Sequence, residues 1–106
     1  MTDWYHVKDN DKYALVDAVF EQPTSVGIDA TREFSFYDSG IFECKTRRRW
    51  QNHAVLAVGY NLVDGYWIIK NSWGEGWGEN GFIRIIFGND KQTCSLYDDS
   101  NQVFVA

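Results

Sequence analysis

Two apolar segments with polar ends constrain the fold of this chain more than any other feature. They are residues 52–60 and 66–71, with residues 61–65 between them. Short apolar runs bounded by turn residues are typical of buried strands, and the intervening residues supply a turn. Antiparallel pairing brings the start of the first strand beside the end of the second. We therefore expect the imidazole of His53 to lie near the carboxamide of Asn71.

The remaining pattern predicts one α+β domain over residues 1–106. Asp9-Asn10-Asp11 offers a helix N-cap, and apolar residues then recur at helical spacing until Gln22-Pro23 ends the run. The apolar positions of this helix are Leu15, Val16, Val19 and Phe20. Further strands are expected at 25–29, 81–87 and 103–105, with an aromatic-bearing connection at 31–40. Mostly antiparallel strands after one short N-terminal helix favour a twisted, barrel-like sheet.

Composition narrows the classes of partner. The 106 residues have a formal net charge of −5, which argues against a nucleic-acid binder because such proteins cluster Lys and Arg on one face. The basic run Arg47-Arg48-Arg49 is interpreted as a solvated loop, or as a positive rim near His53. No apolar stretch reaches the length of a membrane span. The residues after Met1 do not have the pattern of a signal peptide.

The element Asn71-Ser72-Trp73-Gly74-x-x-Trp77-Gly78, placed after Asn52-His53, resembles the asparagine and histidine motifs of the papain family of cysteine peptidases. The resemblance covers roughly residues 4 to 106. It implies the C-terminal, β-rich (right-hand) domain of such an enzyme. Residues 22–29 resemble the strand that enters the barrel of that domain. It implies His53 as the catalytic base and acid, Asn71 as the residue that orients the imidazole, and Trp73 and Trp77 as cover for their hydrogen bond.

The nucleophile of that family is not found in the expected pattern. Papain-like enzymes carry their catalytic Cys in a C-G-[SA]-C-[WY] signature roughly 130 residues before the His. Only 52 residues precede His53 here, and the signature does not occur. The resemblance therefore implies a chain that lacks both the Cys and the oxyanion-hole Gln, and that needs a left-hand, Cys-bearing domain or precursor segment to act on a peptide substrate. Self-association through an apolar patch around His53, Trp73 and Trp77 is a further expectation.

Substrate contacts are implied only by position in the family pattern. Gly27, Gln51, Ala54 and Asp99 resemble residues lining the pocket for the side chain two positions before the cleaved bond, and Asn52 lies beside them. Gln51 stands where an apolar residue is more usual, so a partly polar pocket is expected. An acidic Asp99 would admit Arg. The glycines at 74, 76, 78 and 81 are interpreted as turn residues, and Glu75 and Glu79 as solvent-facing.

The two cysteines, Cys44 and Cys94, admit several interpretations. The resemblance implies a disulfide between them, which places the protein in a lysosomal, vacuolar or extracellular compartment. A reduced pair, or one Cys as nucleophile, are the alternatives. A zinc site is disfavoured because His6 and His53 show no paired spacing with the cysteines, and no cofactor is expected. A non-catalytic binding module derived from a peptidase remains the competing function, and an aromatic-rich carbohydrate-binding domain is a weaker one.

Overall fold

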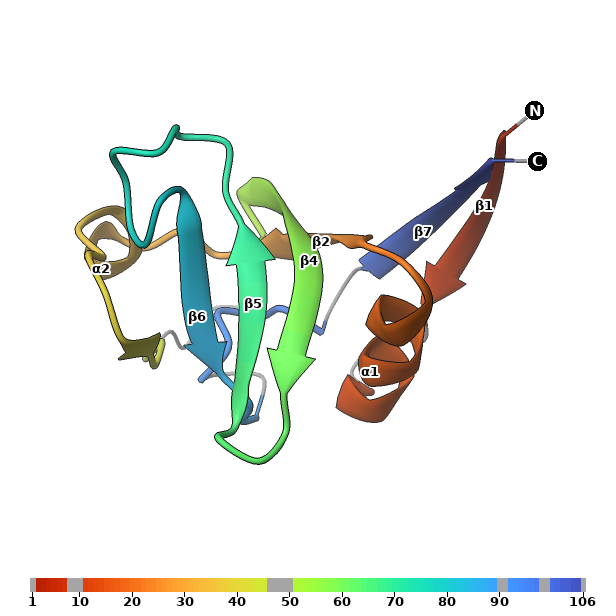
Figure 1. Cartoon of the computed structure of the whole chain (residues 1–106), viewed down its shortest axis with the longest axis horizontal. Coiled ribbons are helices and arrows are strands. Elements are labelled where there is room, and N and C mark those ends of the chain that lie inside the picture. The colour runs from red at the N-terminus through yellow and green to blue at the C-terminus, as the bar shows by residue number, and fades with distance from the viewer. Residues whose placement is uncertain (1, 8–10, 46–50, 90–91, 98–99, 106) are drawn as a thin grey trace.

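A computed structural model describes residues 2–7, 11–45, 51–89, 92–97 and 100–105. Strands are β1 (Thr2–Val7), β2 (Thr24–Ile28), β3 (Ile41–Phe42), β4 (His53–Asn61), β5 (Tyr66–Lys70), β6 (Phe82–Ile86) and β7 (Ser100–Val105). The helices are α1 (Lys12–Glu21) and α2 (Arg32–Ser35). The strands form one sheet in the order β1-β7-β2-β4-β5-β6-β3. Figure 1 shows β1 and β7 as a ribbon that projects away from the other strands.

The sheet confirms the expected α+β architecture and departs from it in two details. Neighbouring strands from β1 to β6 in this order are all antiparallel, whereas the last strand, β3, pairs with β6 in parallel. Within the described residues no pairing joins β1 to β3, so the twisted sheet stays open with these two strands as its edges. The sequence pattern did not predict β1, β3 or α2, because two of these are very short and one lies in an edge ribbon.

Helix α1 begins and ends as its sequence indicates. The carboxylate of Asp11 accepts hydrogen bonds from the backbone N–H groups of Tyr13 and Ala14, both at 3.1 Å, which satisfies donors that a helix start leaves unpaired. Its buried residues are Leu15, Ala18 and Val19, and the helix packs on β4 and β1 (Figure 1). Phe20 was expected in this apolar face but is 80% exposed. It lies about 140° around the helix from Leu15, so it points away from the sheet.

The core lies on one face of the central strands. Alternate residues of β4, β5 and β6 point inward and are fully or nearly fully buried. These inward residues are Val55, Ala57, Trp67, Ile69, Ile83 and Ile85. Trp67 is completely buried, and its indole N–H donates to the Tyr97 hydroxyl at 3.1 Å. That hydroxyl in turn donates to the carbonyl of Gly88 at 2.9 Å, so both polar groups are satisfied.

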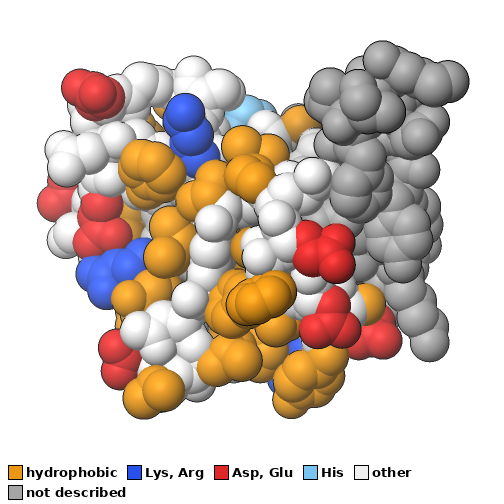
Figure 2. Space-filling model, turned by 45° about the vertical axis from the view of Figure 1, so that its right-hand side comes forward, with side chains coloured by type: hydrophobic (Ala, Val, Ile, Leu, Met, Phe, Trp, Pro, Cys, Tyr) orange, Lys and Arg blue, Asp and Glu red, His pale blue; other side chains and the backbone are white. Residues whose placement is uncertain are grey.

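The opposite face of the same strands is mostly apolar and half-buried, and it also carries Lys70 and Arg84. Its residues include Leu56, Val58, Ile68, Phe82 and Ile86. Figure 2 shows hydrophobic side chains gathered in a band across one face of the molecule. A shallow depression of about 400 Å³ lies at the end of this face, lined by residues of β2, β4 and β5 together with Asn71 and Ser72. Among the described residues, no helix is long and apolar enough to cross a bilayer.

Candidate active site

His53 and Asn71 meet where two neighbouring strands end. His53 is the first residue of β4, and Asn71 directly follows the last residue of β5. Because the two strands run antiparallel, with Leu56 opposite Lys70, these ends lie at the same edge of the hairpin. The Nε2 atom of His53 lies 2.7 Å from the Oδ1 atom of Asn71. The predicted juxtaposition of imidazole and carboxamide is therefore present in the structure.

The hydrogen bonds around Asn71 determine which nitrogen of the imidazole carries the proton. The backbone N–H of Ser72 donates to Asn71 Oδ1 at 2.8 Å, so this atom of the carboxamide is the acceptor. An acceptor at 2.7 Å from His53 Nε2 requires a proton on Nε2. In the neutral ring Nδ1 is then the unprotonated nitrogen, free to take a proton from a reacting group. The Nδ2 atom of Asn71 is buried and has no hydrogen-bond partner among the described residues.

Aromatic rings cover this pair. The Trp73 ring stacks on the His53 ring with centroids 5.0 Å apart, and it remains 43% exposed. Trp77 packs edge-on against Trp73 at 5.3 Å, and its indole N–H donates to the backbone carbonyl of Ser35 at 3.1 Å. Asn71 itself is only 5% exposed. Shielding from water strengthens the hydrogen bond between His53 and Asn71.

Phe34 completes the aromatic cluster and was not singled out from the sequence. It is fully buried and lies 5.5 Å from Trp73, 5.1 Å from Trp77 and 6.4 Å from His53 by ring centroids. It belongs to α2, whose N-cap Thr31 accepts a hydrogen bond from the Phe34 N–H at 3.3 Å. Thr31 with Glu33 in the following turn is the sequence signal that would have placed this helix.

Gln51 and Asn52 fasten the segment that leads into His53. The Gln51 carboxamide nitrogen donates to the carbonyls of Gly27, at 2.9 Å, and Ser95, at 2.8 Å. Asn52 Oδ1 accepts the backbone N–H of Ala30 at 2.8 Å. Both side chains therefore hold neighbouring backbone in place.

The structure places two of the remaining residues expected to line the substrate pocket, Gly27 and Ala54, but does not describe the third, Asp99. Gln51 fills the space beside Gly27, because a Cβ on Gly27 would lie 2.6 Å from Gln51 Oε1. Ala54 is exposed beside His53, on the rim of the depression that also includes Asn71. Asp99 and the run Arg47-Arg48-Arg49 lie outside the described residues, so their expected roles stay predictions.

The two cysteines form a disulfide bond with a Cα–Cα distance of 5.3 Å. Neither is therefore a free thiol or a zinc ligand, which excludes the interpretation of one as the nucleophile. Cys94 and the following Ser95 both have left-handed backbone, with φ of 58° and 63°. Among the described residues no group of three or more His, Cys, Asp and Glu side chains could hold a metal ion.

Glu79 corrects one expectation. It was expected to face solvent, but its carboxylate accepts two hydrogen bonds from the Arg84 guanidinium, both at 2.8 Å. These bonds lower the pKa of Glu79 to about 2 and raise that of Arg84. Tyr37 lies in the same group, and burial raises the pKa of its hydroxyl. The signal in the sequence was the spacing of an acid and a base across the turn into β6.

Comparison with known proteins agrees with this geometry. The family model "Papain family cysteine protease" matches residues 1–104. Papaya proteinase 4 of Carica papaya is 46% identical over 89% of this chain and 28% of its own length. Mexicain of Jacaratia mexicana is 44% identical over 94% of this chain and 47% of its own length. The chain thus spans between about a quarter and a half of these two relatives.

Solved structures show the same relation. The bromelain protease from Ananas comosus, in complex with the E64 inhibitor, superposes with a TM-score of 0.83 at 35% identity, covering 97% of this chain and 50% of the other. A digestive procathepsin L 3 from Tenebrio molitor larval midgut gives a TM-score of 0.85 at 38% identity, covering 96% and 34%. Because the family model matches nearly the whole length of this chain, the chain belongs to the papain family of cysteine proteases.

Proposed function

We propose that this chain is the right-hand domain of a papain-type cysteine peptidase and supplies the catalytic His53 and Asn71 for peptide-bond hydrolysis. The observation that carries the proposal is the 2.7 Å contact between His53 Nε2 and Asn71 Oδ1 beneath the Trp73 ring. It orients the imidazole with Nδ1 toward a reacting group, as the Cys-His-Asn variant of a catalytic triad requires.

The thiolate comes from a partner in this proposal. Both cysteines of the chain are paired with each other, so the nucleophile belongs to a left-hand domain or precursor segment. The Cys thiol of that partner transfers its proton to His53 Nδ1 and attacks the substrate carbonyl. The imidazolium then protonates the leaving amine, and the neutral imidazole later activates the water that releases the acyl group.

The half-buried apolar face of β4, β5 and β6 supports the existence of such a partner. An apolar surface of this kind is typical of one that is covered in the functional assembly. Its end meets the depression beside Asn71, so a domain seated there would reach the imidazole. The longer relatives support an occupant from the other half of the same enzyme. Without it, the face would favour self-association.

A lysosomal, vacuolar or extracellular setting is proposed on the same basis. The Cys44–Cys94 disulfide is compatible with an oxidising compartment, where such bonds persist. The peptide substrate would bind across Gln51, Asn52 and Ala54, next to His53. Asp99 is proposed for the base of the pocket that accepts the side chain two positions before the cleaved bond.

The test is reconstitution. The chain is mixed with a Cys-bearing left-hand domain of a papain-family enzyme, and hydrolysis of a dipeptidyl fluorogenic amide is measured with and without the epoxide inhibitor E64. We expect inhibitor-sensitive turnover from the mixture and none from the chain alone. His53→Ala should reduce turnover by about 10² to 10⁴-fold, the usual contribution of a general acid-base residue, and Asn71→Ala should reduce it less.

Two outcomes would count against the proposal. One is a stable complex, seen by sedimentation, that has no activity with any left-hand domain. The other is inhibitor-sensitive activity that His53→Ala leaves unchanged. Sedimentation of the chain alone at several concentrations reports whether the apolar face also supports self-association.

A further inference from the structure

The loop between β5 and β6, residues 72–81, carries both tryptophans of the site but contains no helix or strand. Its two ends are tied together, because the backbone N–H of Asn71 donates to the carbonyl of Gly81 at 3.0 Å. Within it, the N–H of Gly81 donates to the carbonyl of Trp77 at 2.8 Å. The position of Trp73 over His53 therefore depends on what fixes this loop to the rest of the molecule.

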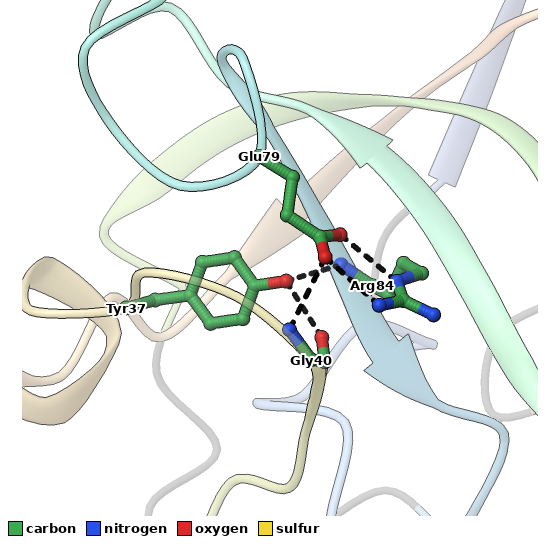
Figure 3. Close-up of polar contacts among 4 residues, drawn as sticks. All are labelled: Tyr37, Gly40, Glu79 and Arg84. Atoms are coloured by element: carbon green, nitrogen blue, oxygen red, sulfur yellow. Dashed lines mark hydrogen bonds and ion pairs between the residues drawn. The ribbon is translucent and has the colours of Figure 1, made fainter.

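Besides the hydrogen bond from the Trp77 indole to Ser35, a carboxylate attaches this loop to the rest of the molecule. Figure 3 shows Glu79 at the far end of the loop, facing Arg84 of β6 and Gly40. Arg84 Nε donates to Glu79 Oε1 and Arg84 Nη2 donates to Oε2, both at 2.8 Å. The backbone N–H of Gly40 donates to Oε2 at 3.2 Å. A two-pronged contact between guanidinium and carboxylate fixes orientation as well as distance.

Tyr37 connects this ion pair to the aromatic cluster. Its hydroxyl donates to the Gly40 carbonyl at 2.6 Å and accepts the backbone N–H of Arg84 at 3.4 Å (Figure 3). Its ring lies 5.6 Å from the Trp77 ring by centroids. Gly78 packs so closely on this ring that a Cβ there would lie 3.1 Å from it. The residues on either side of Gly78 are thus held by the aromatic cluster and by Arg84.

From Trp77 the contacts continue to the imidazole. Trp77 packs against Trp73 at 5.3 Å, and Trp73 stacks on His53 at 5.0 Å. The other route runs along the backbone, from Glu79 through Gly81 to Asn71. Both routes end at the two groups of the hydrogen-bonded pair. The Glu79–Arg84 ion pair is therefore connected through the loop to both the stacked Trp73 ring and the Asn71 carboxamide.

We propose that Glu79 and Arg84 are positioning residues for the catalytic pair, whose ion pair fixes the loop 72–81 and so keeps His53 in its Nε2-protonated, Asn71-bound orientation. This inference rests on the proposed function. Neither residue touches His53, and the effect passes through the loop. A purely structural ion pair would change the stability of the fold and leave the state of the imidazole unaltered, which separates the two roles experimentally.

The experiment measures the ¹⁵N chemical shifts of the imidazole nitrogens in the 106-residue chain at about pH 8.5, where an imidazole is neutral. The signals of His53 are assigned with a His6→Gln variant, since the chain has two histidines. In the unsubstituted chain we expect one protonated and one unprotonated nitrogen, well separated in shift. Glu79→Gln should narrow that separation as the two tautomers mix. Arg84→Lys keeps the positive charge but loses the two-pronged contact with the carboxylate, so it should narrow the separation of the nitrogen shifts less.

Glu75→Gln is the matched control, because Glu75 is an exposed acid on the same loop and the change removes the same charge. It should leave the separation unchanged. The positioning role is overturned if Glu79→Gln lowers the unfolding midpoint but keeps separate nitrogen signals, or if Glu75→Gln has an equal effect. Averaged signals in the unsubstituted chain would instead overturn the His53–Asn71 orientation, and with it the proposed function. Should Glu79→Gln fail to fold, Arg84→Lys decides the question with the same readout.

Discussion

Two segments flank His53, and they are fastened by different chemistry. On one side, loop 72–81 is held by stacked aromatic rings and the Glu79–Arg84 ion pair. On the other, the segment around Cys94 is held by a disulfide, and the Gln51 carboxamide bridges it to β2. Covalent and ionic fastening respond to different conditions. Reduction should loosen only the segment around Cys94, and acid should loosen only loop 72–81.

The largest expected effect comes from the covalent side. Reducing the disulfide, or replacing both cysteines with Ser, opens a loop of 50 residues. The chain-entropy model gives a loss of about 4 kcal/mol in the free energy of unfolding. Urea unfolding with and without reductant measures it. The tryptophan signal in near-ultraviolet circular dichroism should be retained in the folded, reduced protein. Its loss would show that the two sides are not independent.

In loop 72–81, Gly78→Ala should have the next largest effect on the free energy of unfolding. Gly78 has φ of 60°, and an added Cβ would lie 2.5 Å from the carbonyl oxygen of Phe82. The backbone conformation alone costs roughly 1–3 kcal/mol for a non-glycine residue, and the contact adds to it. Two controls in the same loop separate these causes. Gly74→Ala has a positive φ but open space, and Gly76→Ala has neither constraint. Equal unfolding midpoints for all three variants would contradict this reading.

The comparison also shows what sequence reasoning could reach. The His53–Asn71 contact was predictable because two apolar strands and a turn fix which ends meet. The open edge of the sheet was not, since β3 is two residues long and pairs in parallel across a large separation in sequence. The Glu79–Arg84 ion pair was missed because an acid and a base five residues apart across a turn do not by themselves predict a contact, and Gly40, which also donates to the carboxylate, comes from a distant segment. Phe20 was misplaced because periodicity alone does not say which side of an apolar stripe meets the sheet.

A smaller effect is expected from Gly27→Ala, which tests the bridge made by Gln51. The new Cβ would lie 2.6 Å from Gln51 Oε1, and a flexible carboxamide can move away at the expense of its two hydrogen bonds. We expect a loss of about 1 kcal/mol in unfolding free energy. Gly59→Ala is the control, since its nearest contact would be an ordinary 3.4 Å. If the two variants unfold at the same urea concentration, the bridge does not stabilise the fold.

The smallest effect, and the one that tests the ionic side most directly, is the response to acid. Glu79 has a pKa lowered to about 2 from an ordinary 4.5, chiefly by its hydrogen bonds with Arg84. A depressed pKa in the fold means that the contribution of Glu79 to stability is complete above about pH 4.5 and is lost as the pH falls toward 2. Arg84, Tyr37 and the Gly40 N–H face the carboxylate, and neither Arg84 nor Tyr37 changes charge in this window.

The measurement compares urea midpoints of the unsubstituted chain and Glu79→Gln between pH 6 and 2. The gap between them should be widest at the upper end and should close at the lower end, because the protonated carboxyl then resembles the carboxamide. Glu75→Gln should show no such closing gap. Added salt should narrow the gap at pH 6, since the pair is partly exposed and open to screening. A gap that stays constant with pH would mean that the carboxylate holds loop 72–81 through its shape and not through its charge.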